Sequence, residues 1–259
     1  MFSKQTAVSF NRQAWDRMAE AGDRLYLAVT PKEIAAARQG KLKIRLTPTK
    51  TLPESWLSDI AGRQILCLAG GGARQGPLLA AAGASVTVFD LSQQQLQRDR
   101  DIANREKLDL KTVAGDMRDL SHFGDRQFDL IISPCATCFC PETQPIWDEC
   151  FRVLRTGGIL MIGMINPIHY LMDAAKLDKG QFEIRHPIPY SDFDLPDEER
   201  NQLIGSERPI EFGHSLEQLI AGQLEAGFKI TGFFEDAWGG NDPLSKKINT
   251  FLCTRSQKP

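Results

Sequence analysis

Short apolar runs alternate with longer, helix-like stretches between residues 64 and 165, and this alternation restricts the fold more than any other feature of the chain. The apolar runs cover residues 64–69, 85–90, 110–116, 128–133 and 158–165. Helical stretches separate them around residues 77–82, 92–106 and 144–154. Strands that alternate with helices are typical of βαβ units around a parallel sheet. We therefore predict an α/β fold with a doubly wound, Rossmann-like sheet.

The regions on either side of this alternation are less regular. Residues 1–63 are expected to form an N-terminal helical lead-in or lid, with helices at 11–21 and 31–39 and a run of strand periodicity at 41–46. Residues 64–259 form the main domain, in which 166–213 contain five prolines and no clear periodicity. Because long irregular insertions are often lids, we expect this segment to cap the substrate site. A helix at 214–226 and strands at 229–234 and 249–254 follow, and residues 256–259 are expected to be frayed.

The overall charge of the chain argues against a nucleic acid as its partner. The 259-residue chain has a formal net charge of -2, so no overall positive field exists to hold a nucleic acid. Residues 34–53 are a local exception, with basic but no acidic side chains. They are either a solvated face, which we favour, or a contact for an anionic substrate or RNA. A small-molecule partner is expected, and the oligomeric state stays open.

The N-terminus and the cysteines indicate a cytoplasmic protein. The first residues lack the apolar core of a signal peptide, and no uncharged apolar run approaches the roughly 18 residues that a membrane span needs. Six scattered cysteines are typical of reduced thiols. The spacing of Cys135, Cys138, Cys140 and Cys150 invites a zinc site, but no histidine pair completes it, so we predict no metal.

A glycine-rich turn, AGGGARQG at residues 69–76, lies between the first strand and the following helix. Small residues allow a ligand to approach the backbone closely, and free N–H groups at a helix start attract an anionic group. Asp90 ends the second strand, 19 residues after Gly71 of the turn, where an acidic side chain can accept hydrogen bonds from ribose hydroxyls. Together they predict a nucleoside-containing ligand.

The order of motifs decides between cofactors. Gly115-Asp116-Met117 ends the third strand, FDLI opens the fourth, and FRVLRTGG follows at residues 151–158. This order, with the glycine turn and Asp90, resembles the class I S-adenosylmethionine (SAM)-dependent methyltransferase family over residues 64–165. The run LCLAGGGARQGP and the later EFGHSL at 211–216 resemble a bacterial branch of that family. The resemblance implies a seven-stranded sheet in which a C-terminal pair adds one antiparallel strand, and it implies S-adenosylhomocysteine as the product.

The resemblance also implies roles for individual residues. Asp90 would bind the ribose and Asp116 the adenine amine. The methionine part of SAM would face Ala69, Gly70 and Gly71. The adenine ring would lie between Leu91 and Met117. The methyl group would be delivered near Pro134 and Cys135. The family's usual acid before the turn is replaced by Cys67, and two of its glycines by Ala69 and Ala73. Gln75 or an N-terminal group is expected to hold the SAM ammonium in its place.

No catalytic residue can be assigned from the sequence. Methyl transfer from a sulfonium is an in-line displacement that depends mainly on positioning and on exclusion of water. If an acceptor needs a base, candidates near the insertion are His169, Tyr190, Asp192 and His214, although His214 is better explained by packing at a helix start. The run Ser133-Pro134-Cys135-Ala136 does not match the motif of methyltransferases that act on nucleic-acid bases.

Two other functions remain open at this point. An NAD(P)-dependent oxidoreductase is the first, because residues 71–76 are one substitution from the dinucleotide fingerprint and Asp90 fits either cofactor. A non-catalytic SAM-binding protein is the second, because the turn departs from the family pattern. The function we favour is a SAM-dependent methyltransferase with an unidentified, small-molecule acceptor.

Overall fold

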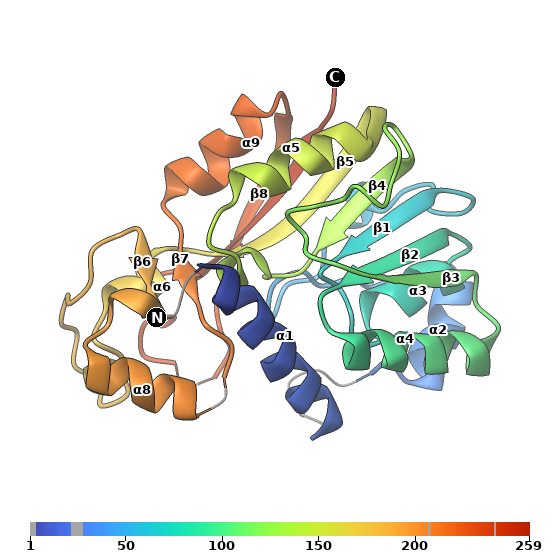
Figure 1. Ribbon diagram of the computed structural model, residues 1–259. Coiled ribbons are helices and arrows are strands. Elements are labelled where there is room, and N and C mark those ends of the chain that lie inside the picture. Colours follow the sequence, from blue (N-terminus) through green and yellow to red (C-terminus); the bar gives the residue numbers. More distant parts are fainter. Residues whose placement is uncertain (1–3, 22–27, 207, 241) are drawn as a thin grey trace.

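A seven-stranded sheet forms the centre of the computed structural model, which describes residues 4–21, 28–206, 208–240 and 242–259 (Figure 1). Its strands are β1 (Gln64–Leu68), β2 (Ser85–Asp90), β3 (Leu110–Ala114), β4 (Phe128–Ser133), β5 (Leu154–Ile165), β8 (Lys229–Asp236) and β9 (Phe251–Gln257). The spatial order is β3-β2-β1-β4-β5-β9-β8. The first five strands are parallel, and β9 is antiparallel to β5 and β8. The predicted doubly wound fold is confirmed.

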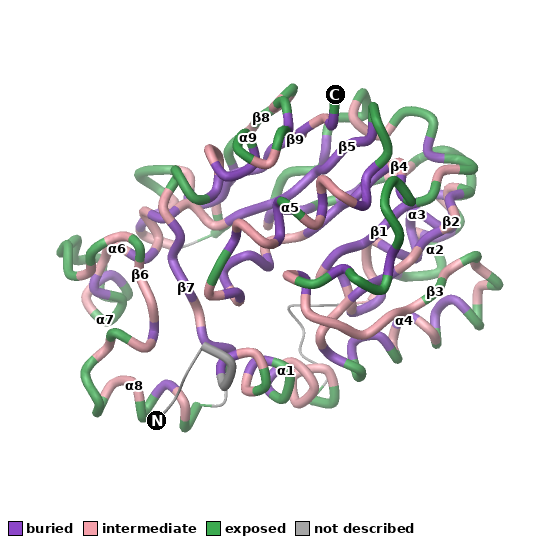
Figure 2. The backbone as a smooth tube through the Cα atoms, turned by 45° about the horizontal axis from the view of Figure 1, so that its top comes forward, coloured by how far each residue is buried: buried purple, intermediate pink, exposed green. Residues whose placement is uncertain are grey.

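Alternate residues of each central strand enter different cores, because successive side chains of a strand point to opposite faces. Ile65 and Cys67 pack with α2 (Pro31–Arg38), α3 (Gln75–Ala81) and α4 (Gln93–Glu106). Leu66 and Leu68 pack on the other face with α5 (Gln144–Val153) and the segment before β8. That segment is one turn of π-helix, Glu217–Ala221, continued by α9 (Gly222–Glu225). Most residues of β1, β4, β5 and β9 are therefore buried (Figure 2).

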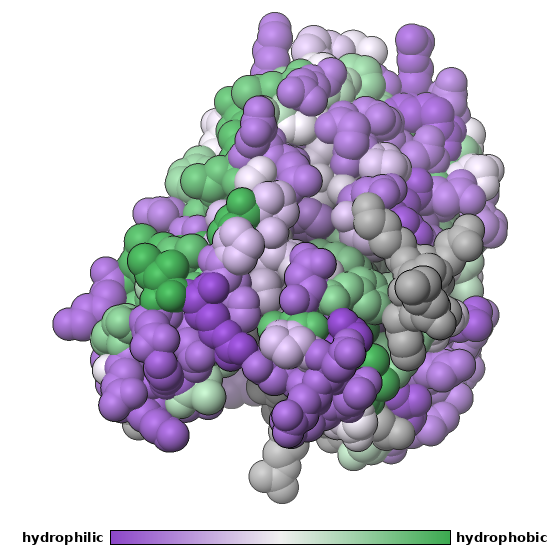
Figure 3. All heavy atoms as spheres, turned by 60° about the vertical axis from the view of Figure 1, so that its left-hand side comes forward, coloured by the Kyte–Doolittle hydropathy of each residue, from purple (hydrophilic) through white to green (hydrophobic). Residues whose placement is uncertain are grey.

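The segment after β5 is a small subdomain beside the sheet. It contains α6 (Ile168–Leu171), α7 (Ala174–Leu177), α8 (Asp197–Gly205) and the antiparallel pair β6 (Tyr190–Ser191) and β7 (Phe212–Gly213). On this side of the molecule, hydrophobic side chains interrupt a mostly hydrophilic surface (Figure 3). The insertion predicted for residues 166–213 is therefore ordered by short elements of its own.

Helix α1 (Lys4–Glu20) lies between this subdomain and α4 (Figure 1). The side chain of Asn11 is buried and forms three hydrogen bonds, from Nδ2 to Phe139 O (3.1 Å) and Ile210 O (3.0 Å) and from Ile210 N to Oδ1 (2.7 Å). At the other end, Asp16 Oδ1 accepts a hydrogen bond from Ser92 Oγ at the start of α4 (2.6 Å). Residues 1–3 and 22–27 of the predicted lead-in lie outside the described residues.

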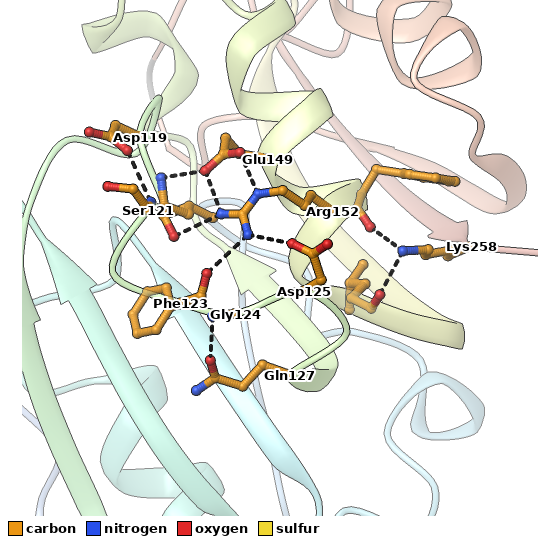
Figure 4. Close-up of polar contacts among 12 residues, drawn as sticks. Asp119, Ser121, Phe123, Gly124, Asp125, Gln127, Glu149, Arg152 and Lys258 are labelled. Atoms are coloured by element: carbon orange, nitrogen blue, oxygen red, sulfur yellow. Dashed lines mark hydrogen bonds and ion pairs between the residues drawn. The ribbon is translucent and has the colours of Figure 1, made fainter.

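A network around Arg152 of α5 fixes the connection between β3 and β4 (Figure 4). Its guanidinium group binds the carboxylates of Glu149 and Asp125 and donates to the carbonyl oxygens of Leu120 and Phe123. Glu149 in turn accepts a hydrogen bond from Leu120 N (2.7 Å). This loop begins directly after the strand that ends near Asp116, so the network holds one wall of the predicted cofactor site.

Two local predictions are wrong. Residues 41–46 alternate between exposed and more buried positions as expected, but they form no strand; they cross over β5, where a Cβ at Gly163 would lie 2.0 Å from Leu46 O. The C-terminus is not frayed, because β9 extends to Gln257 and Lys258 Nζ donates to Phe151 O (2.6 Å) and Leu154 O (2.8 Å), as Figure 4 shows for Lys258. Chain position alone predicted fraying, and these contacts oppose it.

Within the described residues, no helix combines the length and the apolar character that crossing a membrane requires.

Candidate active site

A cavity of about 650 Å³ opens at the carboxyl ends of the parallel strands, in the size range of small-molecule sites. This is where ligands bind in doubly wound sheets. Of the predicted cofactor positions, the cavity wall includes all but Gly70, namely Ala69, Gly71, Gln75, Asp90, Leu91, Asp116, Met117, Pro134 and Cys135. The Cα of Gly70 faces β1 instead, where an added Cβ would lie 3.2 Å from the Cβ of Cys67.

Gly71 and Asp90 are in direct contact. Gly71 N donates to Asp90 Oδ2 (2.8 Å), and Ser92 N donates to Oδ1 (2.9 Å). A Cβ at position 71 would lie 2.9 Å from the Asp90 carboxyl carbon, so this approach requires glycine. Burial raises the pKa of Asp90, although the backbone hydrogen bonds oppose that shift. The carboxylate is thus oriented at the cavity wall before any ligand arrives.

The two alanines that replace family glycines both adopt left-handed backbone conformations. Ala69 has φ 47° and Ala73 has φ 61°, and Gly72 between them has φ 108°. An L-residue with a side chain pays roughly 1–2 kcal/mol for this conformation. The turn therefore keeps the shape that glycines would give it, and other contacts must stabilise it.

Asp99 of α4 supplies those contacts, and sequence reasoning missed it. Its Oδ2 accepts hydrogen bonds from Gly72 N (2.8 Å) and Ala73 N (3.0 Å). The side chain is fully buried, and its Oδ1 has no hydrogen-bond partner among the described residues. Burial raises the pKa of Asp99 to about 7, against the opposing effect of the two N–H groups. The sequence signal that could have identified Asp99 is an acidic residue in α4, the helix that packs against the turn.

Asp116 lies at the cavity wall in an ion pair with Arg118. The Arg118 side chain donates to both carboxylate oxygens, with Nη2 at 2.6 Å from Oδ2 and Nε at 3.1 Å from Oδ1. Arg118 N also donates to Oδ1 (3.0 Å). Leu91 and the buried Met117 follow the two acids and line the same cavity, as predicted from their positions.

The side chains of Gln75 and Cys135 in the cavity wall both contact backbone carbonyl oxygens. Gln75 Nε2 donates to Arg45 O (3.0 Å), and Cys135 Sγ lies 3.3 Å from Leu46 O, so both fasten residues 45–46 over the cavity. Burial raises the pKa of Cys135, which keeps its thiol protonated. Burial raises the thiol pKa of Cys138, Cys140 and Cys150 as well, and the described residues contain no cluster suited to a metal ion.

Aromatic residues form the other end of the cavity, over the ends of β4, β5 and β9. Trp15 of α1 packs edge-on against Phe139 (centroids 5.0 Å apart), and Trp238 packs edge-on against Phe251 (5.0 Å). His169 and Glu211 from the insertion complete this end. Trp238, Phe251 and Glu211 were not identified as lining residues from the sequence.

The base candidates fall into two groups. His169 lines the cavity, and burial lowers its pKa, so its imidazole is neutral near pH 7. His214 is buried with Nε2 at 2.9 Å from Cys140 O and 3.1 Å from Thr137 O, a packing role that holds the loop after β4. Tyr190 donates to Asp192 (2.6 Å), and neither residue belongs to the cavity wall.

Comparisons with known proteins agree with this geometry. A family model described as a methyltransferase domain matches residues 66–162. The chain is 46% identical to an uncharacterized methyltransferase, YbaJ, of Bacillus subtilis, over 97% of this chain and 98% of the relative. Similarity over nearly the whole of both chains shows common family membership.

Solved structures show the same fold. A SAM-dependent methyltransferase of Mesorhizobium loti aligns over 78% of this chain and 94% of its own, with a TM-score of 0.60 and 17% identity. The magnesium protoporphyrin IX methyltransferase of Synechocystis, solved with bound S-adenosylhomocysteine, aligns over 98% of this chain and 100% of its own, with a TM-score of 0.62 and 13% identity. The seven-stranded order, the cavity and the full-length relative together establish that the chain belongs to the class I methyltransferase family, whose methyl donor is S-adenosylmethionine.

Proposed function

We propose that this enzyme transfers the methyl group of SAM to a small molecule held in the aromatic end of the same cavity. The observation that carries the proposal is the continuity of the cavity, which runs from Gly71, Asp90 and Asp116 to Trp15 and Trp238. A methyl transfer needs both reactants in one water-poor space at near-attack distance. An acceptor that fits inside this space is necessarily small.

The cofactor would lie over the ends of β1, β2 and β3. Asp90 is placed to accept hydrogen bonds from the ribose hydroxyls, and Asp116 to accept one from the adenine amine. Leu91 and Met117 provide apolar contacts for the adenine ring. The methionine part would lie on the turn at 69–71, with Gln75 beside it and the sulfonium directed toward Pro134 and Cys135.

The N-terminal region and the insertion would close the site. Helix α1 contributes Trp15 and the insertion contributes His169 and Glu211 to one cavity wall, and Asn11 joins the two segments. We therefore assign residues 1–63 to a lead-in and lid, and residues 166–213 to a substrate cap on the methyltransferase domain of residues 64–259. Family membership does not favour the oxidoreductase alternative.

Calorimetric titration of the purified protein tests the cofactor assignment without knowledge of the acceptor. We expect SAM to bind with micromolar affinity and NADH not to bind. Asp90→Ala should weaken SAM binding at least tenfold, whereas Asp101→Ala, an exposed aspartate on α4, should leave it unchanged. NADH binding without SAM binding would reject the proposal. Normal SAM binding with no turnover on any small acceptor would favour a non-catalytic SAM-binding protein.

A further inference from the structure

Glu211 is a carboxylate in a cavity that the aromatic residues Trp15, Phe139 and Trp238 also line, together with His169. Its side chain is 23% exposed and belongs to the cavity wall. Tyr170 Oη donates to Oε2 (2.9 Å). The nearest cation to Oε1 is Arg208, at 3.9 Å, which is too long for a hydrogen bond. Oε1 of this cavity-lining carboxylate thus has no hydrogen-bond donor among the described residues.

The backbone of Glu211 is held rigidly. Glu211 N donates to Asp192 Oδ2 (2.7 Å), and Asp192 N donates to Glu211 O (3.1 Å). Asp192 is itself buried and accepts a hydrogen bond from Tyr190 (2.6 Å). Tyr170, which donates to the Glu211 carboxylate, stacks on Tyr190 with ring centroids 5.2 Å apart. This framework holds the Glu211 backbone and one oxygen of its carboxylate in place, which is the property expected of a group that recognises a ligand.

The surroundings of Glu211 favour a cationic ligand. The aromatic side chains of Trp15, Phe139 and Trp238 line the same cavity as Glu211, and aromatic faces attract cations. His169 cannot neutralise the carboxylate, because burial lowers the pKa of its imidazole. Arg208 lies 3.9 Å from Glu211 and 3.7 Å from the buried Asp192, so one cation is shared by two carboxylates. A ligand with an ammonium group would supply a second positive charge.

We propose that Glu211 binds and deprotonates the methyl acceptor, and that this acceptor is an aromatic or similarly apolar small molecule with a primary or secondary amine. This inference rests on the proposed function and adds the chemical class of the acceptor. Burial raises the pKa of Glu211, which makes it a better proton acceptor than an exposed glutamate.

The step balances without a further reactant. The ammonium group first transfers one proton to Glu211, which frees the nitrogen lone pair. The nitrogen then attacks the methyl carbon of SAM, and a C–N bond forms as the S–CH3 bond breaks. The bonding electron pair stays on sulfur, so the sulfonium becomes the neutral thioether of S-adenosylhomocysteine. The methylated nitrogen keeps the positive charge and leaves as an ammonium, and Glu211 then releases the proton that it accepted to solvent.

Three probes of similar shape test this charge preference on the protein saturated with S-adenosylhomocysteine: 2-phenylethylamine, 2-phenylethanol and 3-phenylpropionate. We expect calorimetry to show the amine binding at least tenfold more tightly than the alcohol, and no binding of the carboxylate. Glu211→Gln should weaken amine binding at least tenfold without changing binding of the alcohol. Glu198→Gln, an exposed glutamate of the same insertion, should change neither.

A transfer assay gives the catalytic readout. With labelled SAM and 2-phenylethylamine, Glu211→Gln should lower kcat at least tenfold, and Glu211→Asp should restore part of it. SAM affinity should be the same in all variants, so a protein that fails to bind SAM rejects the proposed function rather than this inference. Three results would each overturn the inference. The carboxylate could bind more tightly than the amine, or Glu211→Gln could leave amine binding unchanged. The protein could also bind S-adenosylhomocysteine and not the amine.

Discussion

At the scale of single residues, the cofactor turn shows how a local departure from a family pattern can be compensated at a distance. The sequence lacks the usual acid at Cys67 and has alanines where glycines are usual. In the structure, Asp99 accepts the hydrogen bonds of two turn N–H groups, and both alanines adopt the left-handed conformation. Residue types at the turn predicted its position, but they gave no indication of Asp99, whose contribution depends on how α4 packs.

Asp99 should make stability depend on pH. Its folded pKa, about 7, lies above the ordinary value of 3.8, so the stability that it contributes is present at low pH and decreases as pH rises toward 7. Asp99→Asn keeps an oxygen for the two N–H groups but cannot ionise. We therefore expect the variant to gain free energy of unfolding relative to the wild type between pH 5 and 8, by a few kcal/mol in order of magnitude.

Urea unfolding at several pH values measures this difference. The charged and titratable groups near Asp99 are Cys67, Asp90 and Arg98. The wild type and Asp99→Asn both keep these residues, so a difference in pH dependence reports on Asp99. A difference between the two proteins that stays constant from pH 5 to 8 would contradict the assignment.

Replacing the left-handed alanines should stabilise the fold. Ala73→Gly removes a strain of roughly 1–2 kcal/mol but adds roughly 0.4–1 kcal/mol of chain entropy to the unfolded state. The net gain expected is about 0.5–1 kcal/mol, and Ala69→Gly should behave in the same way. Thermal unfolding measures the effect, with Ala80→Gly in the interior of α3 as the control, which should be destabilising. A lower Tm for both turn variants would contradict the strain assigned to these alanines.

At the scale of elements, the sheet and its helices could be predicted well and the flanking segments poorly. Strands such as β2 and β4 match the predicted ranges because their apolar runs are bounded by polar residues and turns. The extended run at 41–46 has the alternation of a strand, but the edges of the central strands are already paired by neighbours. The spacing of apolar residues indicates which side chains are buried. It does not indicate whether a neighbouring strand is free to form backbone hydrogen bonds.

Asn11 should couple α1 to the insertion. Asn11→Ala removes three hydrogen bonds and leaves buried backbone groups at Ile210 unpaired, at roughly 1–3 kcal/mol for each group that stays unsatisfied. We expect faster amide hydrogen exchange in α1 and in residues 208–213, with the sheet unaffected. Gln13→Ala, an exposed position on the same helix, serves as the control. Equal exchange in the two variants would show that α1 is not held through Asn11.

At the scale of the whole molecule, the doubly wound sheet and most residues of the cofactor half of the cavity could be predicted from the sequence, whereas the residues of the acceptor end could not. Residues of that end come from α1, the insertion and the region around β9, which lie far apart in the chain. Glu211, Trp238 and Phe251 carry no local motif that marks them as neighbours. Only the tertiary structure brings them together.

The last residues contribute to global stability. Lys258 crosses the end of α5, donates to two carbonyl oxygens and lies 4.5 Å from the centre of the Phe151 ring. Lys258→Met keeps most of the apolar stem but removes these bonds, so we expect a loss of roughly 1–3 kcal/mol and a lower Tm. Lys229→Met on the edge strand β8, an exposed position, should have little effect. An unchanged Tm for Lys258→Met would contradict the role given to the C-terminus.

The central claim is that one cavity holds the methyl donor and the acceptor in adjoining halves. A crystal structure of the complex with S-adenosylhomocysteine tests it most directly. We predict the ribose hydroxyls within hydrogen-bond distance of Asp90, the adenine between Leu91 and Met117, and the sulfur directed toward Cys135 and the aromatic end. A ligand bound outside this cavity, or one whose sulfur faces away from the aromatic end, would contradict the account.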